Sequence, residues 1–214
     1  MNTQTIIDCL EAVSEAIIAH ETEIENLDRE IGDGDHLINV KRGCSVLLEM
    51  RNQLAPLSAA DAFTAIGTKL LGTIGGASGP LISSFFLAAG KVLKAAPANR
   101  PPAFADAFAA GVEAIRSRGK ADVGEKTMLD VLIPVARLLS RLSEEGSSLD
   151  VLCAKAKDEA QRGMLATKDM IASKGRAYFL GERAIGHIDP GSKTSQVAIW
   201  AVCDRLLAVS VQNN

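Results

Sequence analysis

The chain has 214 residues, of which 47% are hydrophobic and 4% aromatic, so a folded core of aliphatic side chains is expected. Its net charge is -3 and no long basic run occurs, which argues against binding nucleic acid or an anionic membrane through a basic face. The four cysteines are scattered and form no C-x-x-C pair, which favours reduced thiols. The N-terminus has no basic leader, and the apolar runs are shorter than a membrane span. A cytoplasmic protein is therefore expected.

The first predicted helix has apolar residues at three- and four-residue spacing, with glutamates off that face. The stripe consists of Ile6, Leu10, Val13, Ile17, Ile24 and Leu27. It is expected to stop at an acidic, glycine-bearing loop over 28–35. A second helix is predicted over about 37–53.

A third helix is predicted from the spacing of Ser58 and Asp61, which is that of a capping box. A second glycine-rich turn follows over 72–79. Pro80 then stands where a helix-opening proline belongs, and an apolar helix is expected over 81–93.

The rest of the chain follows the same pattern. Helices are predicted over 104–116, 128–142, 149–172 and from about 192 onward, separated by glycine-bearing loops over 119–124 and 173–191. Ser147 or Ser148 is expected to cap the third of these helices, and Ser192 or Thr194 the last.

The whole chain, residues 1–214, therefore reads as one all-α domain of about eight helices without a fixed repeat. No period-2 run bounded by hairpin turns indicates a strand. The glycine-rich loops are longer than plain helix connections require. Such loops on a rigid scaffold are where function usually lies.

The strongest chemical feature is the acidic loop, in which Asp28, Asp33 and Asp35 are spaced D-x4-D-x-D across glycines. Mg²⁺ takes oxygen ligands, usually a few carboxylates with phosphate oxygens and water. The loop is not an EF-hand, because Leu37 stands where an oxygen ligand is needed. The alternative is a solvated turn whose aspartates cap the next helix, and Asp35 can serve both purposes.

The second feature is Gly75-Gly-Ala-Ser78-Gly-Pro80, which leads into a helix. Small residues let a phosphate approach the backbone, and a helix N-terminus offers unpaired N–H groups. The alternative is a tight turn between helices.

The third feature lies around Gly119 and Gly124, which have P-loop spacing. Glu125 stands where the lysine belongs and a helix precedes the loop, so a P-loop fold is rejected. The cations there, Arg118, Lys120 and Lys126, can balance phosphate charge or be ordinary surface residues.

The fourth feature is the loop with Arg176 and Arg183 among glycines, where a planar guanidinium can bind phosphate. The alternative is a structural loop in which Arg183 pairs with Glu182 or Asp189. No G-x-S-x-G elbow occurs, and the lone histidines of these loops are assigned no general-base role.

Taken together, four segments resemble one family. DREIGDGDH, GGASGP, SRGKADVGEKTMLD and GRAYFLGERAIGHIDPGS occur in the order found in the L subunits of dihydroxyacetone kinases, and the resemblance runs from about Asp28 to Ser192. Four motifs in order are far more specific than any one of them.

The resemblance implies an eight-helix antiparallel up-and-down barrel with the nucleotide at one rim. By it, ADP or ATP is held with two Mg²⁺ ions, and Asp28, Asp33 and Asp35 are the metal ligands. The implied nucleotide-binding residues are His36, Leu37, Ile38, Asn39, Ala77 and Ser78 at the phosphates and sugar, Gly119, Thr127 and Met128 near the base, and Arg176, Asp189, Pro190 and Gly191 at the remaining wall. Phosphoryl transfer depends mainly on positioning and charge neutralisation, which such loops supply.

The resemblance also implies partners. Dihydroxyacetone is bound on a separate K subunit, and a phosphotransferase-system M subunit rephosphorylates ADP in place, so this chain is expected to be inactive alone. A homodimer and a transcriptional regulator are further partners considered.

Two rival functions remain open: the nucleotide half of an ATP-dependent kinase for another short ketose, and a regulatory binding module. Leu37 and Ile38 stand where Gly and Leu are expected. Gly34 replaces the alanine of phosphotransferase-dependent members, and glycine there is common in ATP-dependent ones, so the donor stays open.

Overall fold

The protein is described by a computed structural model that covers residues 2–76, 78–96 and 104–212, and within these residues every regular element is helical. The predicted all-α class is confirmed. The elements are α1 (Thr3–Ala19), α2 (Glu21–Ile31), α3 (His36–Glu49), α4 (Arg51–Leu54), α5 (Ala59–Leu71), α6 (Ser78–Ala95), α7 (Phe104–Gly119), α8 (Leu129–Glu144), α9 (Leu149–Ala166) and α10 (Pro190–Gln212), with 3₁₀ segments η1 (Thr167–Asp169) and η2 (Arg176–Ala184).

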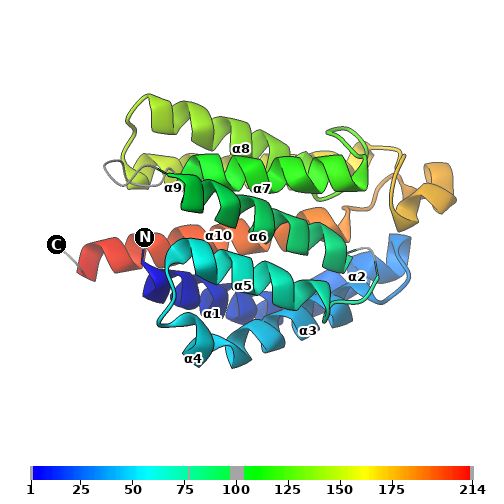
Figure 1. Cartoon of the computed structure of the whole chain (residues 1–214). Helices are drawn as coiled ribbons and strands as arrows, with labels where there is room; N and C mark the ends of the chain where they lie inside the picture. The colour runs from blue at the N-terminus through cyan, green and yellow to red at the C-terminus, as the bar shows by residue number, and fades with distance from the viewer. Residues whose placement is uncertain (1, 77, 97–103, 213–214) are drawn as a thin grey trace.

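The long helices contact one another in a closed order. The order is α1, α3, α5, α6, α7, α8, α9, α10 and back to α1, with α2 packed against α3 and α10 (Figure 1). Among the described residues, these contacts close the long helices into a ring. Figure 1 also shows the four glycine-bearing loops at one end of the bundle and both termini at the other.

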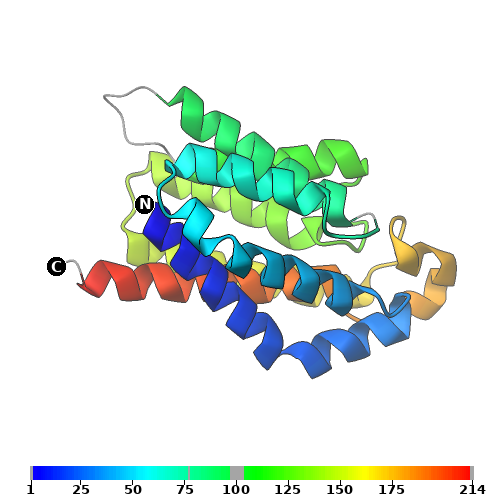
Figure 2. The ribbon, with the colours of Figure 1, turned by 60° about the horizontal axis from the view of Figure 1, so that its bottom comes forward.

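The first predicted helix is two helices. α1 ends at Ala19, and α2 leaves at an angle that is clear in Figure 2. His20 stands at the break, where its Nδ1 lies 2.9 Å from the Ala16 carbonyl oxygen. The apolar stripe hid this break because Ile17 and Ile24, on either side of it, are both buried in one cluster with Leu37 and Val197.

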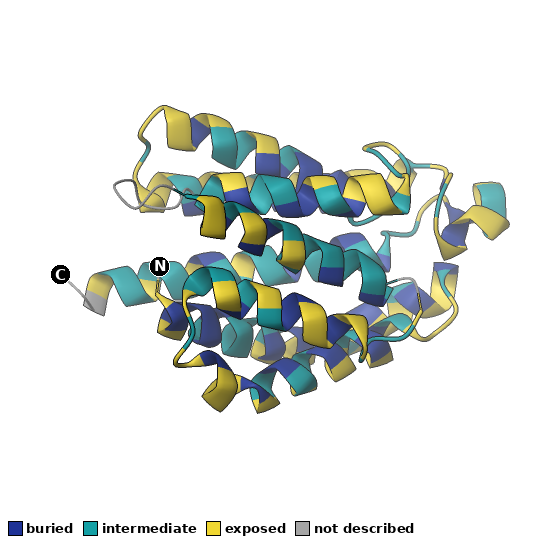
Figure 3. Ribbon diagram, viewed as in Figure 1, coloured by how far each residue is buried: buried dark blue, intermediate teal, exposed yellow. Residues whose placement is uncertain are grey.

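Apolar packing explains the remaining helix assignments. One core cluster joins α1, α3, α4 and α5, and two others join α7, α8, α9 and α10. The predicted helix over 37–53 breaks at Met50, and the short α4 is anchored by Leu54, which is 0% exposed. Burying such a side chain is worth about 1.5–3 kcal/mol. Figure 3 shows buried and exposed positions recurring along each helix.

Helix ends follow the predicted caps only in part. Ser58 caps α5 as predicted, because its Oγ accepts from the Asp61 N–H at 3.1 Å. Ser148 precedes α9 but makes no side-chain cap bond. The predicted helix over 149–172 ends at Ala166 and turns into η1.

α10 is the longest helix described. By length and composition alone, Pro190–Val211 could cross a membrane, which differs from the expectation of no membrane span. It is nevertheless one wall of the ring, since it packs against α1, α9, α2 and α8.

Candidate functional site

The acidic loop joins α2 to α3, and Asp28 lies within α2 rather than in the loop. Its carboxylate is 3% exposed, and Oδ2 accepts from the His36 backbone N–H at 3.0 Å. Asp35, predicted as a cap of α3, makes no side-chain cap bond, so Asp28 serves that role instead. A Cβ on Gly32 would lie 1.8 Å from Asp28 Oδ1, which explains why the turn needs glycine there.

Asp33 and Asp35 lie close together at the tip of the loop. The pKa of the Asp35 carboxyl is raised by desolvation and then by a hydrogen bond and repulsion from Asp33, while Asn39 lowers it. Asp33 Oδ2 is also paired with Arg176 Nε at 2.7 Å. Two carboxylates held together in this way fit a hard divalent cation, whose charge would relieve their repulsion.

The three aspartates do not all point to one spot. Among the described residues, no group of three or more His, Cys, Asp or Glu side chains has the spacing of a ready metal site. Asp28 is turned toward the His36 N–H, while Asp33 and Asp35 lie at the tip of the loop. Asp33 and Asp35 therefore fit a cation directly, whereas Asp28 in this arrangement braces the loop.

The second glycine loop lies against the first. Gly76 has a φ of +65°, and the position of a Cβ there would be 3.9 Å from Asp35 Oδ2. A Cβ placed on Gly75 would likewise lie 3.3 Å from Asn39 Oδ1. Ser78 opens α6, and its Oγ donates to the Gly75 carbonyl oxygen at 3.2 Å. Ala77 lies outside the described residues.

Arg42 is a cation near this contact that the sequence did not single out. Its Nη1 lies 3.7 Å from a Cβ position on Gly75 and donates to Asn39 Oδ1 at 3.3 Å. The spacing of Asn39 and Arg42 along one helix was the available signal, because such residues share a face.

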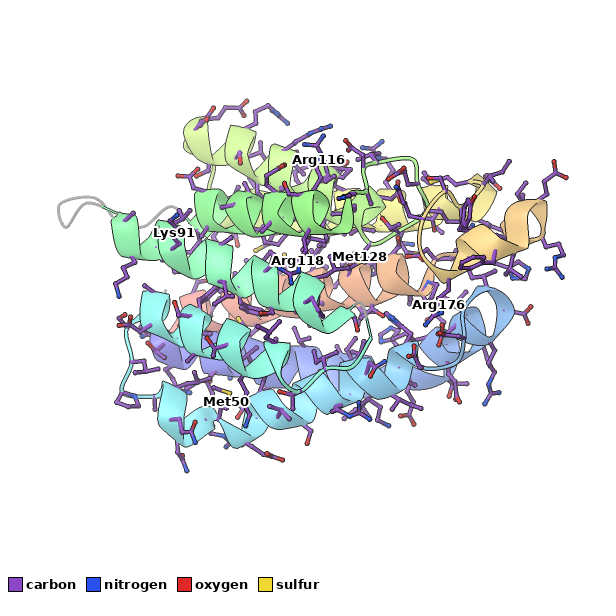
Figure 4. All side chains as sticks on the ribbon, turned by 45° about the vertical axis from the view of Figure 1, so that its right-hand side comes forward. Met50, Lys91, Arg116, Arg118, Met128 and Arg176 are labelled. Atoms are coloured by element: carbon purple, nitrogen blue, oxygen red, sulfur yellow. The ribbon has the colours of Figure 1, made fainter. Side chains whose placement is uncertain are left out.

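The third loop supplies an apolar wall. Met128 packs in the α7–α8 core cluster with Leu81 of α6. Gly119 ends α7, and a Cβ placed on it would lie 3.3 Å from Leu81 Cδ2. A Cβ placed on Gly191 of α10 would lie 3.6 Å from Met128 Cβ. Thr127 adjoins Met128, so the structure brings these expected base-binding residues together. Figure 4 shows Met128 and Arg176 on the side of the bundle that carries the loops.

Two buried polar residues fix this third loop, and only one was noticed in the sequence. Asp130, 2% exposed, accepts from the Gly124 N–H at 2.5 Å and the Thr127 N–H at 2.7 Å. Lys126, 1% exposed, donates from Nζ to the Thr167 and His187 carbonyl oxygens, and burial lowers the pKa of its ammonium group. Its predicted use as a surface or phosphate-facing cation is therefore wrong.

The start of α10 connects the loops. Asp189 Oδ2 accepts from the Ser192 N–H at 2.6 Å, so Asp189 caps α10 and the predicted caps Ser192 and Thr194 are wrong. Ser192 Oγ donates to the Thr127 carbonyl oxygen at 2.7 Å, and Thr194 Oγ1 lies 2.7 Å from His36 Nε2. Burial raises the pKa of Asp189 to about 6. Pro190 is buried at the first position of the helix.

The two hydrophobic residues after His36 behave differently. Leu37 is 8% exposed, and its side chain packs in the core cluster with Ile17, Ile24 and Val197. Ile38 is 58% exposed. Burial lowers the pKa of the His36 imidazole, although Asp28 and Asp35 oppose the effect.

The remaining predicted cations do not converge with the others. Arg118, Lys120 and Arg183 are exposed, and among the described residues Arg183 forms no ion pair with Glu182 or Asp189. His187 Nδ1 lies 3.9 Å from Glu30 Oε2.

An open depression of about 300 Å³ lies beside the third loop. Arg116 in its lining is paired with two of the lining carboxylates, with a contact of 2.6 Å between Arg116 Nη2 and Asp122 Oδ2 and one of 3.3 Å to Glu113.

Comparison with known proteins identifies the family to which these loops belong. The DAK2 domain family matches residues 30–204. The chain is 40% identical over 177 residues to the ADP-binding subunit DhaL of a PEP-dependent dihydroxyacetone kinase of Escherichia coli, covering 82% of this chain and 84% of that protein. It is 36% identical to the ADP-binding subunit of a PTS-dependent dihydroxyacetone kinase of Lactococcus lactis, covering 91% and 93%.

Larger proteins contain a related domain. The human triokinase/FMN cyclase is 32% identical over 92% of this chain, which corresponds to 34% of that protein. The crystal structure of the dihydroxyacetone kinase from C. freundii in complex with AMP-PNP and Mg²⁺ has a TM-score of 0.71 and 28% identity, covering 92% of this chain and 33% of the other.

Proposed function

This chain belongs to the DAK2 domain family, and we propose that it is the ADP- and Mg²⁺-binding subunit of a phosphoenolpyruvate-dependent dihydroxyacetone kinase. The observation that carries the proposal is the meeting of two loops: Asp35, whose carboxyl pKa is raised by desolvation and by neighbouring Asp33, lies directly beside Gly76. Oxygen ligands for a cation and a backbone open to phosphate are thereby adjacent.

The described residues divide the work of holding a nucleotide. Bound Mg²⁺ neutralises phosphate charge and orients the phosphoryl group. Asp33 and Asp35 supply its carboxylate oxygens, with Asp28 expected to join them as a third ligand, and two ions are proposed. Gly75 and Gly76 let phosphate approach the backbone near the start of α6, where unpaired N–H groups favour anions.

The base and the outer phosphate have separate walls. We assign the base to the apolar surface of Met128 with Thr127 and Gly119 beside it. Arg176 now pairs with Asp33 and is exposed, so it is free to exchange that carboxylate for a phosphate oxygen. The α10 start from Asp189 to Gly191 closes this side.

The acceptor belongs to another protein. We propose that dihydroxyacetone is presented by a K subunit and that an M subunit of the phosphotransferase system rephosphorylates ADP in place, in the cytoplasm. The relatives named as ADP-binding subunits support this division of labour. The chain alone is then inactive as a kinase.

A second candidate is the nucleotide half of an ATP-dependent kinase for a short ketose. Gly34 favours it, because ATP-dependent members commonly have glycine where phosphotransferase-dependent members have alanine, and its φ of +77° suits glycine. The triokinase relatives, which carry a related domain within a longer chain, also favour it.

Native mass spectrometry of the purified protein tests the proposal. We expect ADP and two Mg²⁺ ions to remain bound, and labelled ATP to leave the retained ADP unexchanged. Rapid exchange with ATP would support the second candidate instead. Two outcomes would contradict both kinase assignments. In the first, the chain binds no nucleotide with Mg²⁺. In the second, it supports no phosphoryl transfer with any K-type partner and instead binds a transcription factor.

A further inference from the structure

The ring of His36 is attached to a residue outside all four glycine loops. Its Nε2 lies 2.7 Å from Thr194 Oγ1, although the two residues are 158 positions apart. The backbone N–H of His36 is held separately by Asp28 at 3.0 Å. The residue is thus fixed at two points by two different helices, α2 and α10.

The hydroxyl of Thr194 has one proton to donate, and it donates that proton in a second hydrogen bond. Thr194 Oγ1 donates to the Pro190 carbonyl oxygen at 2.9 Å, one turn back along α10. A carbonyl oxygen can only accept, so the hydroxyl proton belongs to that bond. The contact with His36 must then be donated by the ring, which places a proton on Nε2.

We propose that Thr194 is a positioning residue that fixes the His36 ring with Nε2 protonated and Nδ1 as its only atom available to a bound nucleotide. Among the described residues, no hydrogen-bond partner is found on Nδ1. The neighbouring Lys193, paired with Glu23 at 3.0 Å, holds the same turn of α10 against α2, so the hydroxyl is held at a fixed place. The nucleotide part of this inference rests on the proposed function, whereas the ring orientation does not.

His20 provides an internal reference for the same measurement. Its Nδ1 lies 2.9 Å from the Ala16 carbonyl oxygen, so a neutral His20 ring carries its proton on Nδ1. The two histidines should therefore show opposite tautomers in one spectrum, and the chain contains only three histidines to assign.

The experiment is a long-range ¹H–¹⁵N correlation spectrum of the full chain at mildly alkaline pH, with resonances assigned from His36→Gln and His20→Gln. We expect His36 with Nε2 protonated and His20 with Nδ1 protonated. If His36 of the wild-type protein carries its proton on Nδ1, that spectrum alone overturns the proposal.

Two variants of Thr194 then separate positioning from packing. Thr194→Val keeps the shape and removes the hydroxyl, whereas Thr194→Ser keeps the hydroxyl. We expect Val to give mixed His36 tautomers and about tenfold weaker ADP–Mg²⁺ binding by calorimetry, equivalent to about 1.4 kcal/mol. Ser should restore both.

The outcomes distinguish this inference from the proposed function. Unchanged tautomer populations in Thr194→Val refute the positioning role, whether or not ADP affinity falls. A wild-type chain that binds no ADP contradicts the proposed function, while the tautomers of wild type, Val and Ser still decide whether Thr194 orients the ring.

Discussion

Asp28 Oδ2 accepts a hydrogen bond from the backbone N–H of His36 at 3.0 Å, so the last turn of α2 caps the first turn of α3. One of the three aspartates predicted as metal ligands therefore has a structural role before any ligand arrives. Asp33 and Asp35 have no such bond to a helix end, and they are the better positions at which to test metal binding.

Asp33→Asn is expected to release metal and nucleotide together. The amide keeps the size of the side chain but removes the charge that a divalent cation needs, and it also weakens the pair with Arg176. Native mass spectrometry should show loss of both ligands, with at least about tenfold weaker ADP binding, or about 1.4 kcal/mol.

Glu25→Gln is the matched control for that variant. Glu25 is an exposed carboxylate on α2 whose partner is Arg29, four residues on. Removing the Glu25 charge should leave ADP and Mg²⁺ bound. ADP retained by Asp33→Asn without metal would argue against a metal-bridged nucleotide.

Gly76→Ala is expected to weaken nucleotide binding as well as stability. Gly76 has a φ of +65°, where a Cβ costs about 1–2 kcal/mol. Gly146 has a φ of +72° with nothing within 4 Å of a Cβ, and it lies in the α8–α9 connection at the other end of the bundle.

Gly146→Ala therefore carries similar backbone strain without touching the site. Both alanine variants should lower the free energy of unfolding in urea by similar amounts. Only Gly76→Ala should reduce ADP affinity in calorimetry. Equal ADP affinities in the two variants would show that the second glycine loop does not approach the phosphates.

Arg176→Ala should change ligand binding more than folding. The ion pair with Asp33 has side chains 67% and 34% exposed, so its contribution to stability is about 0–1 kcal/mol. We expect the unfolding midpoint to stay near wild type while ADP affinity falls several-fold. Arg29→Ala, which removes an equally exposed arginine paired with Glu25, should change neither. A large loss of stability in Arg176→Ala alone would instead make the arginine a structural clamp.

Asp189→Asn should alter how stability depends on pH. Burial raises the folded-state pKa of Asp189 to about 6, above the value of about 3.9 in an unfolded chain. The folded state therefore binds this proton more tightly, and the advantage is present below about pH 4 and is lost as pH rises through about 6. Asparagine can still accept from the Ser192 N–H but does not titrate.

The unfolding free energy of wild type relative to this variant should thus fall by about 1–2 kcal/mol between pH 4 and pH 7, after allowance for partial exposure. Urea titrations across that range give the comparison. Parallel stability curves for the two proteins would mean that Asp189 has an ordinary pKa.

The sequence predicted what depends on local spacing. The helix class, the cap at Ser58 and the glycine-bearing loops at helix ends were all readable from neighbours within a few positions. The break at His20 was not, because no glycine or proline marks it and the apolar stripe continues on both sides.

Long-range partners were beyond the reach of spacing. Lys126 looked like one surface cation among several, and only the fold shows that its ammonium group reaches two carbonyl oxygens distant in the sequence. Thr194 looked like a helix cap, and its contact with His36 depends on the closure of α10 against α3. Cap residues at α10 were misplaced because Asp189, Ser192 and Thr194 are all good cap formers and only geometry selects among them.

The contact between α1 and α10 has a consequence for synthesis on the ribosome. The acidic loop is translated early, whereas Asp189 and Thr194 emerge only after α1 to α9 have been made. Until α10 leaves the exit tunnel, α1 lacks one of its two neighbours in the ring, and His36 lacks the hydroxyl of Thr194. A nascent chain can therefore form individual helices as it grows, but the end of the bundle that carries the glycine-bearing loops is completed only when α10 packs against α1.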